Sequence, residues 1–309
     1  MSLASRLPYD HAYAGGYPGL SSQALPTDAD ALDYLSRMAT ADGAGVEVGV
    51  ATAVDAFFRA VKDAGIYSDL KACCILAGAR TITGALVPLA GTAPTAQGGW
   101  ASGDYSRTEG LTGDANALYL DTNRAGDADP QDDSHAAVFC TSLPSTAIST
   151  AYISNVPPSG LTGATLLSRT SVSPNNNGWR LRSSAGIGDT SNTGLLAASR
   201  ASASEFWYSN GQSVQSTLST SEARPTTDFF IFASAGGTSL QSDATIAFYS
   251  IGESLGNDPE SGLAALDTAV TNLINRLKFA LLVGENPSGL DPDTIDYIVR
   301  GYEAGGTLE

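Results

Sequence analysis

Between residues 104 and 251 the chain is a series of short segments separated by turn residues, and this restricts its fold more than any other feature. Segments such as 116–122, 135–142, 193–200 and 244–251 are rich in Ser, Thr, Gly, Asn and aromatic residues. Turn signals separate them about every 8–12 residues, a spacing typical of all-β sandwiches. Asn210-Gly211, between β-prone runs, predicts a hairpin with a two-residue type I′ turn.

At the end of this strand-rich region the spacing of apolar residues changes from that of a strand to that of a helix. Ile246, Phe248 and Tyr249 lie in a short apolar run that predicts a buried strand. Asn257-Asp258-Pro259 then has the composition of a helix start, with proline at the first helical position. Apolar residues follow at helical spacing up to Leu281. We therefore expect residues 104–282 to form a sandwich closed by a helix near 259–282.

The region before the sandwich reads as helical. Residues 28–77 carry apolar stripes at helical spacing, the clearest running from Val46 to Val61, and residues 66–77 suggest one more short helix. We expect residues 28–103 to be a helical collar and linker. Residues 1–27, with three tyrosines among Gly and Pro, predict either an extended arm lying on a partner or a disordered tail.

The last segment, 283–309, repeats an earlier one. Asp296-Tyr297-Ile298-Val299-Arg300 aligns with Asp33-Tyr34-Leu35-Ser36-Arg37, and the similarity continues towards the last residue. Residues 293–309 therefore resemble the start of a second module. We expect this tail to begin that module in a longer precursor or to dock on a neighbouring subunit in place of its helix 28–41. Chance similarity between two short amphipathic helices is the alternative.

The charge balance excludes two classes of partner. The chain has 16 basic and 32 acidic residues and a net charge of −16. Nucleic acids and anionic membranes bind mainly through Lys and Arg, so neither is expected as a partner. The three cysteines, Cys73, Cys74 and Cys140, do not make a disulfide framework and predict buried thiols. No apolar run reaches the ~18 residues of a membrane span, so a soluble protein is expected.

Motifs of common enzymes are missing from the sequence. It contains no HExxH, GxSxG, P-loop or paired CxxC pattern. His135 starts an apolar run and is interpreted as structural. Glu205 and Asp228 are the acids near strand segments with aromatic neighbours, but Glu205 lacks a companion acid at strand spacing. We therefore assign no catalytic residue and expect a protein that is not an enzyme.

Two groups of residues are candidates for binding. The acidic run 121–133 could supply oxygen ligands to Ca²⁺ through Asp121, Asp127, Asp129 and Asp132, although it lacks the EF-hand order. A solvated acidic loop is the alternative, and no cofactor is required. Trp179, Trp207 and Tyr208 could stack on sugar rings, while a place in the sandwich core is the other reading of these aromatics.

Four segments follow one another along the chain: the run Gly110-Leu-Thr-Gly-Asp-Ala-Asn-Ala-Leu-Tyr-Leu-Asp-Thr122, the Asn210-Gly211 hairpin, the strand from Asp228, and Ser250-Ile-Gly-Glu-Ser-Leu255 before the closing helix. In this order they resemble the laminin-G-like, concanavalin A-like jelly rolls of bacteriophage virion proteins. The predicted helical segment at 46–77 also resembles the segment that precedes the jelly roll in these proteins. The resemblance covers roughly residues 28–282.

The resemblance implies a mainly β protein, an antiparallel jelly-roll sandwich preceded by a small helical segment. It further implies a structural protein of the virion, in a tail or head fibre or a capsid decoration, used for adhesion or particle stabilisation. The expected partners are other virion proteins through the N-terminal arm, further copies of the chain and a host surface glycan. The alternative function is a soluble carbohydrate-binding lectin or a glycan-active enzyme of the same fold.

Overall fold

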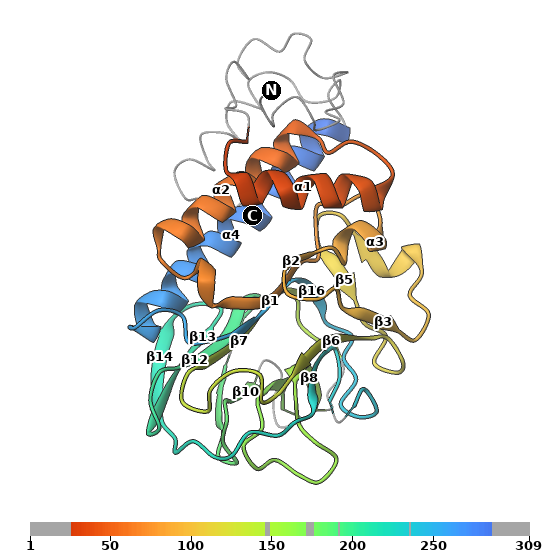
Figure 1. Ribbon diagram of the computed structural model, residues 1–309. Coiled ribbons are helices and arrows are strands. Elements are labelled where there is room, and N and C mark those ends of the chain that lie inside the picture. The colour runs from red at the N-terminus through yellow and green to blue at the C-terminus, as the bar shows by residue number, and fades with distance from the viewer. Residues whose placement is uncertain (1–25, 146–148, 171–175, 191, 235, 286–309) are drawn as a thin grey trace.

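The computed structural model describes residues 26–145, 149–170, 176–190, 192–234 and 236–285. Within them the chain forms two antiparallel β-sheets, with helices before and after the strands (Figure 1). This confirms the predicted sandwich with an N-terminal helical segment and a closing helix. Nearly all of the expected arm 1–27 and of the tail 283–309 lies outside the described residues.

The larger sheet, sheet A, has nine strands within the described residues, and its main path runs β14-β13-β12-β7-β16-β1-β2. These strands are β14 (Val214–Leu218), β13 (Glu205–Asn210), β12 (Gly194–Arg200), β7 (Ser134–Ser142), β16 (Thr245–Gly252), β1 (Leu70–Ile75) and β2 (Pro88–Ala90). β5 (Gly110–Thr112) pairs with β16 and with β4 (Tyr105–Ser106).

Sheet B has seven strands within the described residues, in the order β11-β10-β9-β8-β15-β6-β3. They are β11 (Ile187–Thr190), β10 (Asn176–Arg180), β9 (Leu166–Arg169), β8 (Thr150–Ser154), β15 (Asp228–Ile231), β6 (Tyr119–Ala125) and β3 (Thr95–Gln97). The helices are α1 (Ala29–Asp42), α2 (Val48–Asp63), α3 (Ile82–Ala85) and α4 (Pro259–Glu285), with 3₁₀ turns at Tyr67–Asp69 and Ser102–Asp104.

Sheet A is buried on both faces, which gives the protein two cores. In β7, Ala136 and Val138 belong to the core between the sheets. Ala137 and Phe139 belong instead to the core beneath the helices. The same division applies to β12, where Leu196 faces the other sheet. The protein is therefore built in three layers, with the helices on sheet A and sheet B beneath it (Figure 1).

Helices α2 and α4 cover one face of sheet A and run in opposite directions. Gly49, near the start of α2, lies so close to Ala280, near the end of α4, that a Cβ at Gly49 would be 2.6 Å from the Ala280 Cβ. α4 begins at Pro259, as the sequence predicts, and extends to Glu285. Among the described helices, α4 included, none combines the length and apolarity that crossing a membrane requires.

The expected short helix at 66–77 is corrected by the structure. Leu70–Ile75 forms β1, which pairs with β16 and β2 inside sheet A. Cys73 packs under the helices and Cys74 between the sheets, both fully buried. A strand buried on both faces has no polar–apolar alternation, so its sequence reads like that of a buried helix. Strands therefore begin well before residue 104, the boundary expected between collar and sandwich.

The predicted hairpin forms, but its turn is shifted by one residue. β13 and β14 pair up to Ser209 and Val214, and the Asn210 N–H then bonds to the Ser213 carbonyl at 3.3 Å. Gly211 has φ +83°, whereas Gln212 is not among the residues with positive φ. Glycine alone at the first central position fits a type II′ turn, since type I′ needs positive φ at both positions.

Substituting Phe57 by Ala tests the joint between the helices and sheet A. Its ring lies 5.8 Å from that of Phe248 in β16, and both side chains are almost fully buried. We expect Phe57→Ala to lower the free energy of unfolding by about 3–5 kcal/mol, through lost burial and the cavity left behind. Leu218→Ala, at a side chain that is 84% exposed, is the control and should change it by less than about 0.5 kcal/mol. Urea denaturation measures both, and equal effects would contradict this placement.

Candidate functional site

The glycine-rich run at 110–122 carries the chain from one sheet to the other. Gly110 has φ +104°, and a Cβ there would lie 2.2 Å from the Ile246 carbonyl oxygen. The Asp114 Oδ1 then accepts the N–H groups of three following residues, at 2.8–2.9 Å, which closes a tight turn before β6. Burial opposes ionisation, but these bonds hold the pKa of Asp114 below its ordinary value. The motif is therefore a structural crossing.

The three aromatic candidates for sugar stacking do not lie on a free face. Trp179 is 1% exposed and packs 5.1 Å from Tyr208, ring centre to ring centre, in the core between the sheets. Tyr208 is 2% exposed, and its hydroxyl bonds to the Gln215 side-chain oxygen. Trp207 points the other way and packs, half-buried, on the core beneath the helices. The core reading is thus the correct one for Trp179 and Tyr208.

Arginines hold part of the acidic run 121–133. Asp129 is buried and accepts from both Arg124 Nε, at 3.0 Å, and Arg124 Nη2. Arg224 donates to the carbonyls of Asp127 and Asp129. Asp132 accepts from the Ser221 hydroxyl. In the described part of the chain, no three His, Cys, Asp or Glu side chains gather so that they could hold a metal. The structure therefore does not bring the four expected calcium ligands together.

A second, deeply buried arginine completes this arrangement. Arg182 is 1% exposed, donates to the Gly126 carbonyl and lies over the Phe229 ring. Burial lowers the pKa of Arg182 to about 10, and the nearby Asp129 carboxylate counteracts the shift. The part of the run that follows β6 is thus a folded loop in which the Gly126, Asp127 and Asp129 carbonyls accept from arginines.

His135 has a structural role at the junction between β16 and α4. Its Nδ1 bonds to the Glu253 carbonyl and its Nε2 lies 3.0 Å from the Ser250 hydroxyl. Burial lowers the pKa of His135, despite the bond to Glu253. A buried imidazole with both nitrogens bonded cannot reach a substrate, which agrees with the structural interpretation of this residue.

The outer face of sheet B carries partly exposed polar side chains and the Tyr119 ring, with the Phe230 ring buried beside them. Along β6, Leu120 and Thr122 are buried, while Tyr119, Asp121 and Asn123 alternate with them and are partly or fully exposed. Phe230 of β15 pairs with Asp121, so the two share this face. The Tyr119 and Phe230 rings lie 5.9 Å apart, edge to face. We name Tyr119, Asp121, Asn123, Asp228 and Phe230 the sheet B patch.

Two carboxylates in this patch lack cationic partners. In the described chain no salt bridge involves Asp121 or Asp228, and Asp121 accepts only the Asn123 N–H, at 2.9 Å. Burial, together with the nearby Asp121 and Asp127 charges, raises the pKa of Asp228. A carboxyl group whose pKa is raised by burial and by like charges, with no cation beside it, makes this face a candidate functional site.

Sequence reasoning considered both acids but not as a pair. The sequence makes Asp121 a candidate calcium ligand, whereas Asp228 is considered as a hydrolytic acid and not assigned as one. Alternation within each strand places Asp121 and Asp228 on the outward face. Only the pairing of β6 with β15, about 100 residues apart in sequence, brings the two strands together.

Substituting Arg124 tests whether its guanidinium group, and not a calcium ion, stabilises the Asp129 carboxylate. Arg124→Met leaves the buried Asp129 carboxylate without its partner, so we expect a loss of about 3 kcal/mol in the free energy of unfolding. Lys71→Met is the control, because the Lys71–Glu253 pair is partly exposed and is worth less than about 1 kcal/mol. Urea denaturation with and without EDTA should give the same midpoint for the wild type. A calcium-dependent midpoint would contradict this reading.

The lowered pKa of His135 predicts a pH dependence of stability. In the unfolded chain the imidazole takes up a proton near its ordinary value of 6.5, while the buried ring resists protonation. Acid therefore favours unfolding, and the free energy of unfolding should fall as the pH drops from 7 to 5, by at most about 1.4 kcal/mol per pH unit from this group. Urea denaturation of His135→Gln across this range should show a smaller slope. Parallel curves for the two proteins would refute the role assigned to His135.

No protein-family model and no curated protein matches this chain. Solved structures resemble it in part. The botulinum neurotoxin serotype D binding domain matches with a TM-score of 0.43 and 9% identity, over 67% of this chain and 52% of that one. The chain thus spans about half of that domain. The CBM40 of the Ruminococcus gnavus IT-sialidase gives 0.30 and 10%, over 43% and 83%.

A third similar structure is domain 4 of AbnA, a GH43 extracellular arabinanase from Geobacillus stearothermophilus, in complex with arabinotriose. Its TM-score is 0.32 at 13% identity, over 57% of this chain and 82% of that one. These are partial similarities, and the β-sandwich itself is established by the strand order of the two sheets.

Proposed function

We propose that this chain is a non-catalytic adhesion module that binds neutral glycans on the sheet B patch. The observation that carries the proposal is Asp121 and Asp228, two carboxylates without cationic partners on the sheet face that also carries the partly exposed Tyr119 ring. Carboxylates accept hydrogen bonds from sugar hydroxyls, and aromatic rings pack against the apolar faces of sugar rings.

The charge of the patch sets the class of glycan. Asp121, Asp127 and Asp228 act on one another in a chain with a net charge of −16. Acidic sugars would be repelled from such a surface, whereas hydroxyl groups of neutral sugars are good donors to it. The ligand is therefore a neutral oligosaccharide, and a bound hydroxyl would relieve the repulsion between the carboxylates.

The proposal is non-catalytic because of where the acids lie. Asp121 and Asp228 belong to neighbouring strands of one sheet face. Glycoside hydrolysis needs two acids that flank the scissile bond. The pocket between α2 and α4, in contrast, is lined mainly by alanine and carries no carboxylate. A binding role uses the acids as hydrogen-bond acceptors alone.

We place this module on a bacteriophage particle, in a tail or head fibre or a capsid decoration. Support comes from the order of the segments at 110–122, 210–211, 228–233 and 246–255 in the sequence. The arrangement of layers is compatible with presenting the sheet B patch to a ligand, because the helices cover sheet A and leave the outer side of sheet B accessible. Mass spectrometry of purified virions tests this placement, and absence of the chain from the particles would count against it.

Glycan binding is tested with the full chain on an array of neutral and acidic glycans, followed by calorimetry with the best neutral oligosaccharide. We expect binding that EDTA does not change and that Asp121→Ala and Asp228→Ala each weaken about tenfold or more, as the loss of one hydrogen-bonded charged group would. Asp63→Ala, at an exposed position of α2, removes the same charge away from the patch and should bind like the wild type. Binding of acidic glycans only, or equal binding by all variants, would refute the proposal.

A further inference from the structure

Strand β14 lies at the outer edge of sheet A and, among the described strands, pairs with β13 alone (Figure 1). Beyond the two ends of this pairing, the Asn210 N–H bonds to the Ser213 carbonyl and the Ser219 N–H to the Ser204 carbonyl. Bonded and non-bonded pairs alternate in an antiparallel ladder, so these two bonds fix the orientation of every residue between them. The residues whose backbone N–H and C=O groups point away from β13 are therefore Val214, Ser216 and Leu218.

The other edges of the two sheets carry features that hinder pairing with a further strand. β2 and β3 have three residues each, with Pro88 in the one and Pro94 directly before the other, and β4 has two. In β11, Asp189 lies opposite the buried Asn177 and so belongs to the inner face. Short edges, prolines and inward charges each discourage the addition of a strand.

β14 has none of these protective features. It is five residues long and pairs with β13 without a break in register. No charged residue or proline lies between Phe206 and Ser221. Leu218 is nevertheless 84% exposed, the largest fraction for a large hydrophobic residue in the described part of the chain. An uncharged edge with an exposed leucine is suited to pairing with another strand.

The side chains of the three outward residues lie on one face of this edge. Ser216 is opposite Trp207, which packs on the core beneath the helices, and Val214 packs on the same core. Alternation along the strand places Leu218 on this face as well. A second strand beside β14 would therefore contact an uncharged row of valine, serine and leucine.

Two copies of this row match one another. In an antiparallel pair with Ser216 on the two-fold axis, Val214 of each copy lies opposite Leu218 of the other. Apolar side chains then meet apolar ones, and the free backbone groups form three bonded pairs, or about six hydrogen bonds. No charge lies opposite a charge, which matters in a chain with a net charge of −16. Registers shifted by two residues set Leu218 opposite Ser216 or Gln212 instead.

We propose that the chain forms a two-fold dimer through β14, in which sheet A continues from one copy into the other. The partner strand is thus β14 of a second copy, antiparallel and centred on Ser216. Because the contact involves five residues on each side, we expect weak association, with a Kd of about 10–100 µM. Dilute solutions then contain the monomer with Leu218 exposed. The inference is independent of the glycan site, which lies on sheet B.

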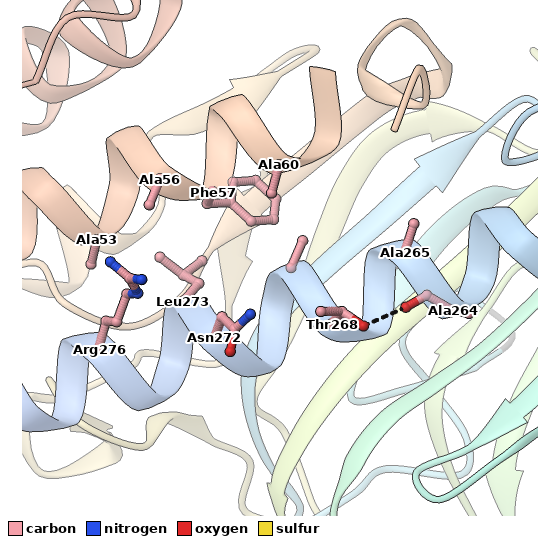
Figure 2. Close-up of a pocket in the computed structure, with 11 residues that line it drawn as sticks. Ala53, Ala56, Phe57, Ala60, Ala264, Ala265, Thr268, Asn272, Leu273 and Arg276 are labelled. Atoms are coloured by element: carbon pink, nitrogen blue, oxygen red, sulfur yellow. Dashed lines mark hydrogen bonds between the residues drawn. The ribbon is translucent and has the colours of Figure 1, made fainter. Parts of the chain in front are cut away.

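The groove between α2 and α4 is the competing contact surface (Figure 2). It has a volume of about 510 Å³ and is lined mainly by alanine. The helices pair their own backbone groups, so the groove lacks the directional bonds that set a register at β14. Asn272 lies on the α4 side of the groove and is exposed, so a charge placed there tests this surface separately.

Analytical ultracentrifugation of the full chain over a range of concentrations tests the dimer. We expect Ser216→Lys to weaken self-association at least about tenfold, because each new ammonium group faces its own copy across the axis. Ser216→Glu should weaken it in the same way, and an equimolar mixture of the two variants should associate again. Thr220→Lys is the matched control, since it adds the same charge at an exposed position outside the paired stretch. It should associate like the wild type.

Disulfide crosslinking tests the register. The Cα atoms of a bonded antiparallel pair lie about 5.5 Å apart, within the range of a disulfide. Ser216→Cys should therefore give a covalent dimer on mild oxidation, which a non-reducing gel detects. In Thr220→Cys the two thiols lie about 27 Å apart along straight strands, so this variant should stay uncrosslinked. The native cysteines are fully buried and do not contribute.

Other outcomes overturn the proposal. A wild-type chain that stays monomeric up to about 1 mM lacks the contact. Loss of association in Asn272→Lys, with Ser216→Lys unaffected, assigns the contact to the groove. Crosslinks in both cysteine variants mean that the copies do not meet in the register centred on Ser216. Circular dichroism spectra that match the wild type confirm that each variant is folded.

Discussion

The burial of sheet A on both faces is the constraint on which the rest of the structure depends. Leu195 and Ala197 pack beneath the helices, while Leu196 and Ala198 from the same strand pack against sheet B. A sheet with two apolar faces needs a cover on each side, because either face left in water would lose the free energy that its burial provides. The helices are therefore part of the folding unit and not an appended collar.

The connection from β16 to α4 holds this cover in place through polar contacts. Backbone N–H groups of residues 254–256 donate to Asp133, Ser199 and Asp69, which come from three distant parts of the chain. The His135 ring bonds to the carbonyl that precedes them. Each contact satisfies a buried or partly buried backbone N–H group of this connection that would otherwise be unpaired.

The same layering leaves the outer side of sheet B without a helix over it. Its loop at 121–133 is held by arginines, so the acidic run is not available as a ready cation site. The Asp121 and Asp228 carboxylates remain without such partners. The arginine contacts therefore mark the loop as structural. The carboxylates without cationic partners mark the outer face of sheet B as a candidate binding face.

The sequence by itself determined the sandwich, the helix start at Pro259, the hairpin near Asn210 and the buried thiols, because periodicity and turn chemistry are local properties. Tertiary structure decided that Leu70–Ile75 is a strand, since burial on two faces removes the alternation that identifies one. It also placed Trp179 in the core and set Asp121 opposite Phe230 and Asp228 opposite Ala125 on neighbouring strands. These outcomes depend on which strands pair, and contacts between residues 100 positions apart leave no local pattern to read.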